Sequence, residues 1–263
     1  MRCYNYIVNS IDHGGRMLKL KIDRAKYARF LIVIASLFVA GEYIFAILAQ
    51  TAPLAEWGAV CFSSIVLAPA FCIFFAEKSL EYIFPQLALI CTVCADYFLV
   101  YLEGEEQLTA MIFFSGTQIF YFLRLISKTE LGVLRTVHLA VRLGVTVLAV
   151  LVTLLILGKG ADLLSVVSVF YYAHLILNFI FAILTRGETP LFAIGLLLFI
   201  GCDTFVGFAM MGDYIPIAEG SLIDRLNKIP LNMAWVFYTP SQTLLALSLL
   251  PKKLKRACAT KND

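Results

Sequence analysis

Three acidic residues lie within long apolar stretches of this sequence, namely Glu42, Asp96 and Asp203. A carboxylate at the centre of a membrane helix costs about 2.5–3.5 kcal/mol on insertion scales, so a carboxyl group in such a place usually serves a function. Two buried carboxyls that face each other can hold different protonation states, one acting as an acid and the other as a base. This pattern indicates acid–base chemistry inside a membrane.

Other polar side chains are expected at a similar depth. At 1.5 Å per helical residue, each of the three carboxyls lies about seven residues, or roughly 10 Å, from the expected outer end of its span. Further polar residues on spans of the opposite direction lie within roughly 10–16 Å of the same face by the same arithmetic. These are Gln118, Tyr171, His174, Tyr238 and Gln242. We therefore expect a polar chamber in the outer half of the bilayer.

Structural roles compete with these functional ones. Asp96 and Asp203 could hydrogen-bond to Gln, Tyr or backbone groups of neighbouring helices and fix the helix packing. A single His in an apolar helix, such as His174, is more often a satisfied core residue than a catalyst. For Glu42 the two roles are balanced.

The basic residues within or beside the spans are expected to contact lipid. Arg124 and Arg142 lie near the expected inner ends of their spans, from which a long side chain can extend to phosphate head groups. We expect them to act as anchors and His138 to lie at the interface.

The elements that must position these residues are transmembrane helices. Of the 263 residues, 61% are apolar and 15% charged, against about 45–50% apolar in soluble domains. A helix needs roughly 20 apolar residues to cross a bilayer. We expect an all-α, polytopic membrane bundle of about eight transmembrane helices, at 27–49, 57–75, 80–102, 108–127, 135–157, 163–184, 190–210 and 231–250. This domain, 27–250, lies between basic cytoplasmic tails, 1–26 and 251–263.

The distribution of Lys and Arg predicts the orientation, because cytoplasmic segments carry the excess. With the N-terminus inside, seventeen of the 21 basic residues lie on the cytoplasmic side, Arg142 lies within a span, and the outer loops hold only Lys159, Arg225 and Lys228. The first 26 residues contain no apolar segment of the kind found in a cleavable signal peptide. We expect a multi-pass protein of a bacterial plasma membrane with both termini cytoplasmic.

The helices also contain a possible internal repeat. Residues 92–99 resemble 199–206, and each segment contains one of the two aspartates. Residues 116–119 likewise resemble residues 240–243. The first segment contains Gln118 and the second contains Gln242. Because four spans separate the copies, both run in the same direction, as in the parallel repeats of some transporters.

The residues around these positions resemble the YhhN-type lysoplasmalogenase family, a family of eight-span membrane proteins. The resemblance covers most of the chain. The residues that carry it are Ala95-Asp96, then Phe113, Gly116, Gln118 and Tyr121, then Gly195 through Phe199 to Cys202-Asp203, and finally Tyr238 with Gln242. The chain departs from the family at Ala68, where a Lys is expected before Pro69, and at Gln118, where bacterial members commonly have His.

The resemblance implies hydrolysis of the vinyl-ether bond of a lysoplasmalogen. It assigns Asp96 and Asp203 to the catalytic acid and base, in either order. The expected substrate-binding residues are Glu42, Gln118, Tyr121, His174, Tyr238 and Gln242. We expect a membrane lipid or lysolipid as substrate, no metal or other cofactor and no nucleic acid, with a homodimer as the candidate assembly.

Two other functions fit the same sequence. Buried carboxyls in a parallel repeat also occur in proton-coupled transporters of small molecules. A non-catalytic protein that binds lipid is the other alternative, which the departure at Ala68 favours. Cys91 and Cys94 form a CxxC pair, but a packing role is expected because no second ligand pair accompanies them.

Overall fold

The computed structural model of the chain describes residues 80–102, 106–129, 132–185 and 188–249, together with 7–11, 17–21 and separate residues between 33 and 73. Five described helices are long and apolar enough to cross a membrane. Their helical cores are α3 (Leu80–Asp96), α4 (Gln107–Ser127), α5 (Gly132–Leu157), α6 (Leu163–Leu184) and α7 (Pro190–Met210). The prediction of a multi-pass helical membrane protein is confirmed.

The helix bounds agree closely with the spans expected from hydropathy. Helices α6 and α7 begin and end where predicted, whereas α5 begins at Gly132 rather than at residue 135. The last predicted span contains α9 (Met233–Leu247), a helix of 15 residues. The first two predicted spans lie largely outside the described residues.

Side-chain caps explain where two of the spans begin. Asp162 caps α6, since its Oδ1 accepts a hydrogen bond from Ser165 N at 2.7 Å and its own N–H donates to Ser165 Oγ at 3.1 Å. These bonds to Ser165 hold the pKa of Asp162 below its usual value. Thr189 caps α7, and Pro190 occupies the first helical position, where no backbone donor is needed.

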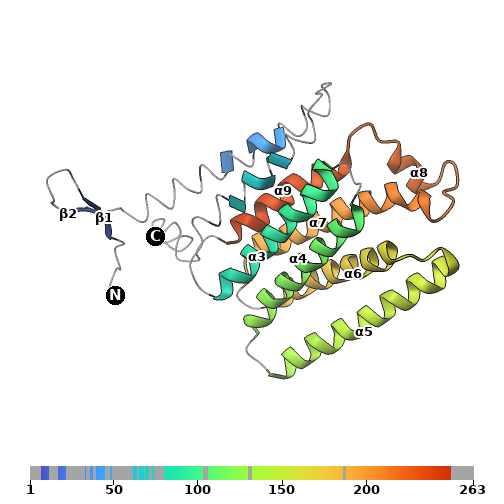
Figure 1. The fold of residues 1–263 in the computed structure, drawn as a ribbon, viewed down its shortest axis with the longest axis horizontal. Coiled ribbons are helices and arrows are strands. Elements are labelled where there is room, and N and C mark those ends of the chain that lie inside the picture. Colours follow the sequence, from blue (N-terminus) through green and yellow to red (C-terminus); the bar gives the residue numbers. More distant parts are fainter. Residues whose placement is uncertain are drawn as a thin grey trace, which may run out of the picture.

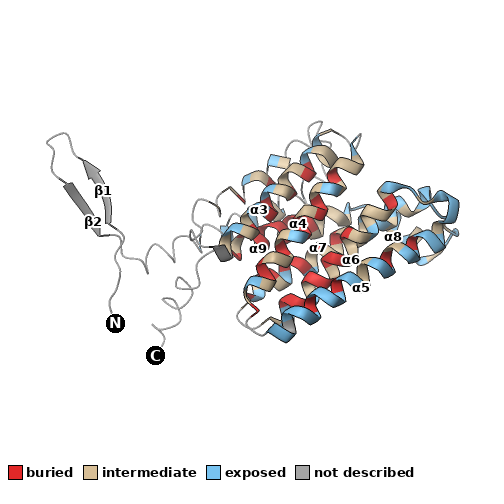
Figure 2. Cartoon of the chain, turned by 60° about the horizontal axis from the view of Figure 1, so that its bottom comes forward, coloured by how far each residue is buried: buried red, intermediate tan, exposed pale blue. Residues whose placement is uncertain are grey.

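The helices pack in a defined order (Figure 1). α3 lies against α4, α4 against α6, and α6 against both α5 and α7, while α9 lies along α7. Buried residues gather between α3, α4, α6, α7 and α9, whereas much of α5 is exposed (Figure 2). The polar site described below therefore lies in the best-packed part of the bundle.

Glycines allow α7 and α9 to approach closely. A Cβ atom at Gly195 would lie 2.8 Å from Leu245 Cγ, and one at Gly201 would lie 2.9 Å from Phe237 Cδ1. Both distances are shorter than packed carbon atoms tolerate, so larger residues at these positions would force the two helices apart.

Several described elements were not expected from the sequence. Within the basic N-terminal segment, β1 (Ile7–Ile11) pairs antiparallel with β2 (Met17–Lys21). A short helix, α8 (Leu222–Asn227), interrupts the long connection between α7 and α9. Helix α3 ends at Asp96 and continues as a π-helix over Tyr97–Tyr101. π-helical segments often occur at functional sites, and this one begins directly after a candidate catalytic residue.

Candidate active site

The first candidate carboxyl, Asp96, is almost fully buried at the end of α3, with 1% of its surface exposed. Tyr238 of α9 donates a hydrogen bond from its hydroxyl to Asp96 Oδ2 at 2.6 Å. The tyrosine is itself buried. A carboxyl in this position is removed from water and is held by a single phenolic donor among the described contacts.

The second candidate carboxyl, Asp203 of α7, has a similar partner in different surroundings. Tyr171 of α6 donates a hydrogen bond to Asp203 Oδ2. Because Asp203 is only half-buried, its surroundings suit a negative charge better than those of Asp96 do.

One aromatic ring joins the two pairs. Phe199 precedes Asp203 by one helical turn, and its ring centroid lies 5.5 Å from that of Tyr238 and 6.3 Å from that of Tyr171. The carboxyl groups of Asp96 and Asp203 are also close enough to interact electrostatically. The structure thus brings both aspartates and both tyrosines together around Phe199.

Polar atoms without partners lie on the helices that form this site. Four polar atoms form no hydrogen bond with any described residue, namely Gln242 Oε1 and Nε2, Gln118 Nε2 and the Tyr121 hydroxyl. All three residues are almost fully buried. Leaving a buried polar group unpaired costs about 1–3 kcal/mol. Water or a polar ligand is the expected partner of such groups.

Glu42 contacts α9, the helix that also contributes Tyr238 and Gln242. Its Oε2 accepts a hydrogen bond from Thr243 Oγ1 at 3.2 Å, and Thr243 directly follows Gln242 on α9. The contact shows that a residue from the first predicted span reaches α9.

His174 lies in a polar network between α5 and α6. Arg142 Nη1 lies 3.0 Å from His174 Nδ1, and Thr146 Oγ1 lies 2.9 Å from His174 Nε2. Arg142 also donates to Asn178 Oδ1 at 2.6 Å. Both ring nitrogens of His174 are therefore bonded to residues of α5, and no described contact joins them to either aspartate.

The structure corrects the prediction that Arg142 anchors the protein to lipid head groups. Arg142 is 4% exposed, and its guanidinium lies 4.3 Å from the centroid of the Phe122 ring. Neutral acceptors bind both terminal nitrogens of the guanidinium within the bundle, an aromatic face lies against it, and its Nε has no hydrogen-bond partner among the described residues. The cation is thus held inside the bundle and does not extend to phosphate. His138 is likewise buried against Phe122 and Phe181 rather than interfacial.

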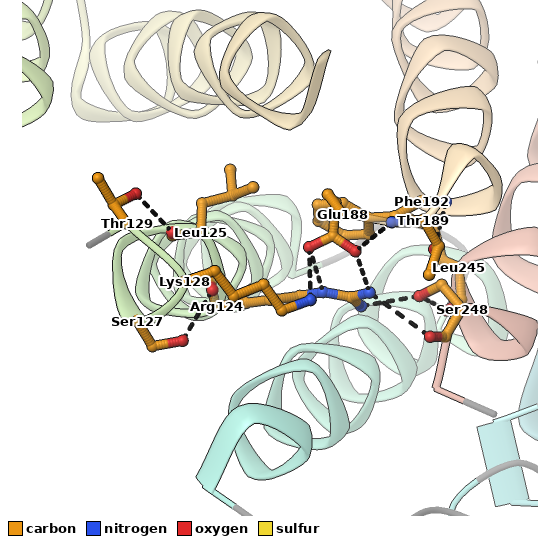
Figure 3. Close-up of polar contacts among 10 residues, drawn as sticks. All are labelled: Arg124, Leu125, Ser127, Lys128, Thr129, Glu188, Thr189, Phe192, Leu245 and Ser248. Carbon is orange, nitrogen blue, oxygen red and sulfur yellow. Dashed lines mark hydrogen bonds and ion pairs between the residues drawn. The ribbon is translucent and has the colours of Figure 1, made fainter. Parts of the chain in front are cut away.

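The prediction for Arg124 is wrong for a related reason (Figure 3). Arg124 donates to Glu188 Oε1 at 2.7 Å and Oε2 at 3.1 Å, and to Ser248 Oγ at 2.7 Å. Lys128 Nζ lies 2.8 Å from Glu188 Oε2. Burial alone would raise the pKa of Glu188, but the two cations lower it to about 2. This ion cluster joins α4, the connection before α7 and the end of α9.

Sequence analysis missed Asn178 and Glu188. Asn178 follows Tyr171 and His174 at a spacing that places all three on one face of α6, so helical periodicity could have identified it. Glu188 lies in a short connection between helices, where its sequence position gives no sign of its burial.

Comparison with known proteins adds one finding. A family model described as the YhhN family matches residues 57–249, a range that contains both aspartates and helices α3 to α9. No curated protein and no solved structure matches the chain.

Proposed function

The chain belongs to the YhhN family, and from this premise we propose that it is a membrane-embedded hydrolase of the vinyl-ether bond of a lysoplasmalogen. The observation that carries the proposal is the pair of aspartates, each bonded to a tyrosine, around Phe199. Vinyl-ether hydrolysis needs an acid that protonates carbon and a base that activates water, and two carboxyls in unlike surroundings can supply both.

The surroundings of the carboxyls favour Asp96 as the acid and Asp203 as the base. Burial disfavours the charged form of a carboxyl, and hydrogen bonds from donors favour it. Each carboxyl accepts one hydrogen bond from a phenol, but Asp96 is almost fully buried whereas Asp203 is only half-buried. Asp96 therefore begins the reaction protonated and Asp203 begins it ionised.

In the first step, Asp96 transfers its proton to the vinyl carbon distant from the ether oxygen. The double bond supplies the electron pair, and an oxocarbenium ion forms at the neighbouring carbon. The negative charge of Asp203 stabilises this cation. The Tyr238 hydroxyl stabilises the carboxylate left on Asp96, because it already donates to Oδ2.

In the second step, water adds to the oxocarbenium carbon and gives one proton to Asp203. The product of this addition is a hemiacetal. The hemiacetal then loses the glycerol oxygen, which takes the proton from Asp203, while the hemiacetal hydroxyl returns a proton to Asp96. One water is consumed, a fatty aldehyde and a glycerophospho-alcohol are released, and both aspartates recover their starting states.

The membrane arrangement proposed for this function has eight spans, a parallel repeat and both termini in the cytoplasm. The contacts of α3 with α4 and of α7 with α9 support the repeat, since these are the two pairs that it relates. With this orientation the two aspartates lie in the outer half of the bilayer. A single-chain lipid then places its tail among the helices and its head group at the outer surface.

The proposal is tested by incubating the purified protein in detergent with a vinyl-ether lysolipid and with its ester-linked counterpart. Fatty aldehyde from the first and no fatty acid from the second is the expected result. A lysolipid with a saturated ether serves as the control, because it has no double bond to protonate. Release of fatty acid, or no aldehyde from the vinyl ether, would reject the proposed function.

A further inference from the structure

The hydrogen bond between Arg142 and Asn178 determines how the Asn178 amide is oriented. Arg142 Nη2 lies 2.6 Å from Asn178 Oδ1. A guanidinium has donors and no acceptor, so the atom facing it must be the amide oxygen of Asn178. The amide nitrogen of Asn178 is therefore directed towards its other neighbour, Gln118 of α4.

The orientation of Asn178 in turn determines that of Gln118. Asn178 Nδ2 donates to Gln118 Oε1 and to Gln118 O, both at 2.9 Å. Because the side-chain oxygen of Gln118 already accepts this bond, the remaining group on its amide is the nitrogen. Gln118 Nε2 is buried and has no hydrogen-bond partner among the described residues.

Arg142 itself is held from the opposite side by His174. Arg142 Nη1 donates to His174 Nδ1 at 3.0 Å, so the ring hydrogen lies on Nε2 and points to Thr146 Oγ1 at 2.9 Å. The Thr146 hydroxyl donates in turn to Arg142 O at 2.8 Å. The donors and acceptors of these hydrogen bonds are mutually consistent. The bonds to His174 and Asn178 hold the guanidinium of Arg142 in one orientation.

The free nitrogen of Gln118 belongs to the helix that lines the candidate active site. Phe114 precedes Gln118 by one helical turn, and its ring centroid lies 5.5 Å from that of Tyr171 and 6.0 Å from that of Phe199. Gln118 therefore lies one turn along α4 from Phe114, whose ring contacts Tyr171 and Phe199.

We infer that Arg142 and Asn178 are positioning residues that hold Gln118 as a hydrogen-bond donor to an oxygen atom within the active site. This inference rests on the proposed function. The acceptor is an oxygen either of the bound lysolipid or of the hydrolytic water. Among the described residues, Arg142 forms no ion pair with a carboxylate, and a role in orienting the amides accounts for a cation buried among neutral groups.

The test uses Asn178→Asp, which reverses the directions of the hydrogen bonds. The new carboxylate accepts from Arg142 but cannot donate to Gln118, so the Gln118 amide turns its nitrogen towards residue 178 and presents its oxygen to the active site. The substitution gives Arg142 an anionic partner, but it also places a carboxylate oxygen against Gln118 O, to which Asn178 Nδ2 donates at 2.9 Å, so the Tm of the variant is measured first. We expect kcat/KM for the vinyl-ether lysolipid to fall about tenfold or more, which corresponds to about 1.4 kcal/mol.

A double-mutant cycle separates positioning from a general structural effect. The second variant is Gln118→Leu. If Asn178 acts through Gln118, Asn178→Asp lowers kcat/KM in the wild-type background but changes it less than about twofold when Gln118 is already Leu. The matched control is Asn227→Asp on α8, where an exposed Asn donates to Phe208 O at 2.9 Å, and it leaves kcat/KM unchanged.

The affinity of the same four proteins for a saturated-ether lysolipid identifies the acceptor without requiring turnover. If the variants bind this lysolipid more weakly than the wild type does, and the effects of the two substitutions on affinity are not additive, the acceptor oxygen belongs to the lysolipid. Unchanged affinity with a non-additive loss of kcat assigns it to the water. Independent effects of the two substitutions in both measurements overturn the inference.

The two proposals fail separately. Absence of aldehyde with the wild-type protein rejects the proposed function. The double-mutant cycle of affinities for the saturated-ether lysolipid still tests the positioning of Gln118, because additive effects of the two substitutions would count against it. If Asn178→Asp does not fold, Asn178→Leu removes the donor to Gln118 with a similar volume. It is expected to show the same non-additivity with Gln118→Leu.

Discussion

The Tyr238 hydroxyl lies 2.6 Å from Asp96 Oδ2, and this hydrogen bond joins α9 to the end of α3 across 142 positions of sequence. The contact makes the last described helix part of the candidate site. The position of α9 against α3 and α7 therefore controls the geometry around Asp96.

Replacing either tyrosine that binds an aspartate lowers the proposed activity. Tyr238→Phe and Tyr171→Phe each remove one hydroxyl that donates to a carboxyl group. A hydrogen bond to a charged group contributes about 1.5–3 kcal/mol, so we expect kcat to fall about 10- to 100-fold with little change in KM. Tyr214→Phe is the control, because that hydroxyl lies 3.5 Å from the capping residue Asp162. An unchanged kcat in both active-site variants would contradict the assigned roles.

Gly195→Ala destabilises the contact between α7 and α9. The added Cβ would lie 2.8 Å from Leu245 Cγ and 3.2 Å from Leu245 N, so the backbone must move. Overpacking of this kind costs about 1–3 kcal/mol. We expect a lower apparent Tm in detergent and a lower rate of aldehyde release. Gly207→Ala on the same helix meets nothing within 4 Å and keeps the wild-type Tm, so equal losses in both variants would refute this explanation.

The buried ion cluster at Glu188 contributes far more stability than an exposed ion pair does. Glu188→Ala leaves Arg124 and Lys128 without their shared carboxylate, and breaking a buried pair costs about 3–5 kcal/mol. Asp224→Ala breaks the more exposed pair with Lys228, whose atoms lie 2.8 Å apart, and such pairs contribute about 0–1 kcal/mol. Unfolding in detergent should show a large fall in Tm for the first variant and almost none for the second. Similar small losses would show that the cluster is not important for stability.

Glu188 also predicts a dependence of stability on pH. Its pKa is about 2 in the folded protein against 4.5 ordinarily, so its contribution is complete above pH 4.5 and disappears as the pH falls through 2. The difference corresponds to about 3 kcal/mol. Glu188→Gln should therefore have a lower Tm than the wild type at pH 6, and the gap should narrow as the pH falls from 4.5 towards 2. A constant gap over that range would contradict the assignment.

Hydropathy predicted the described membrane helices well because bilayer thickness limits the length of an apolar span. The same length rule placed Asp96, Asp203, Tyr171 and Tyr238 at a common depth, and the structure brings these four residues together. The pairing of each aspartate with one particular tyrosine could not be predicted, since depth along a helix does not determine which neighbour it faces.

The buried arginines show the limit of reading charge from sequence. Arg142 and Arg124 occur near the ends of their spans, where an arginine usually reaches lipid phosphate. Their actual partners, Asn178 and Glu188, lie on other segments at separations of 36 and 64 residues. The packing of α5 against α6 brings Arg142 to Asn178, and the position of the connection before α7 brings Glu188 to Arg124. Neither contact follows from the spacing of these residues along the chain.

If Asp96 and Asp203 act on one substrate as a unit, their substitutions will not have independent effects on the single-turnover release of aldehyde from a vinyl-ether lysolipid. Asp96→Asn and Asp203→Asn should each lower the rate by about a thousandfold or more, and the double variant should be no slower than the slower single variant, because residues that act as a unit are not additive. A single variant that keeps the wild-type rate, or losses that simply multiply in the double variant, would contradict the account.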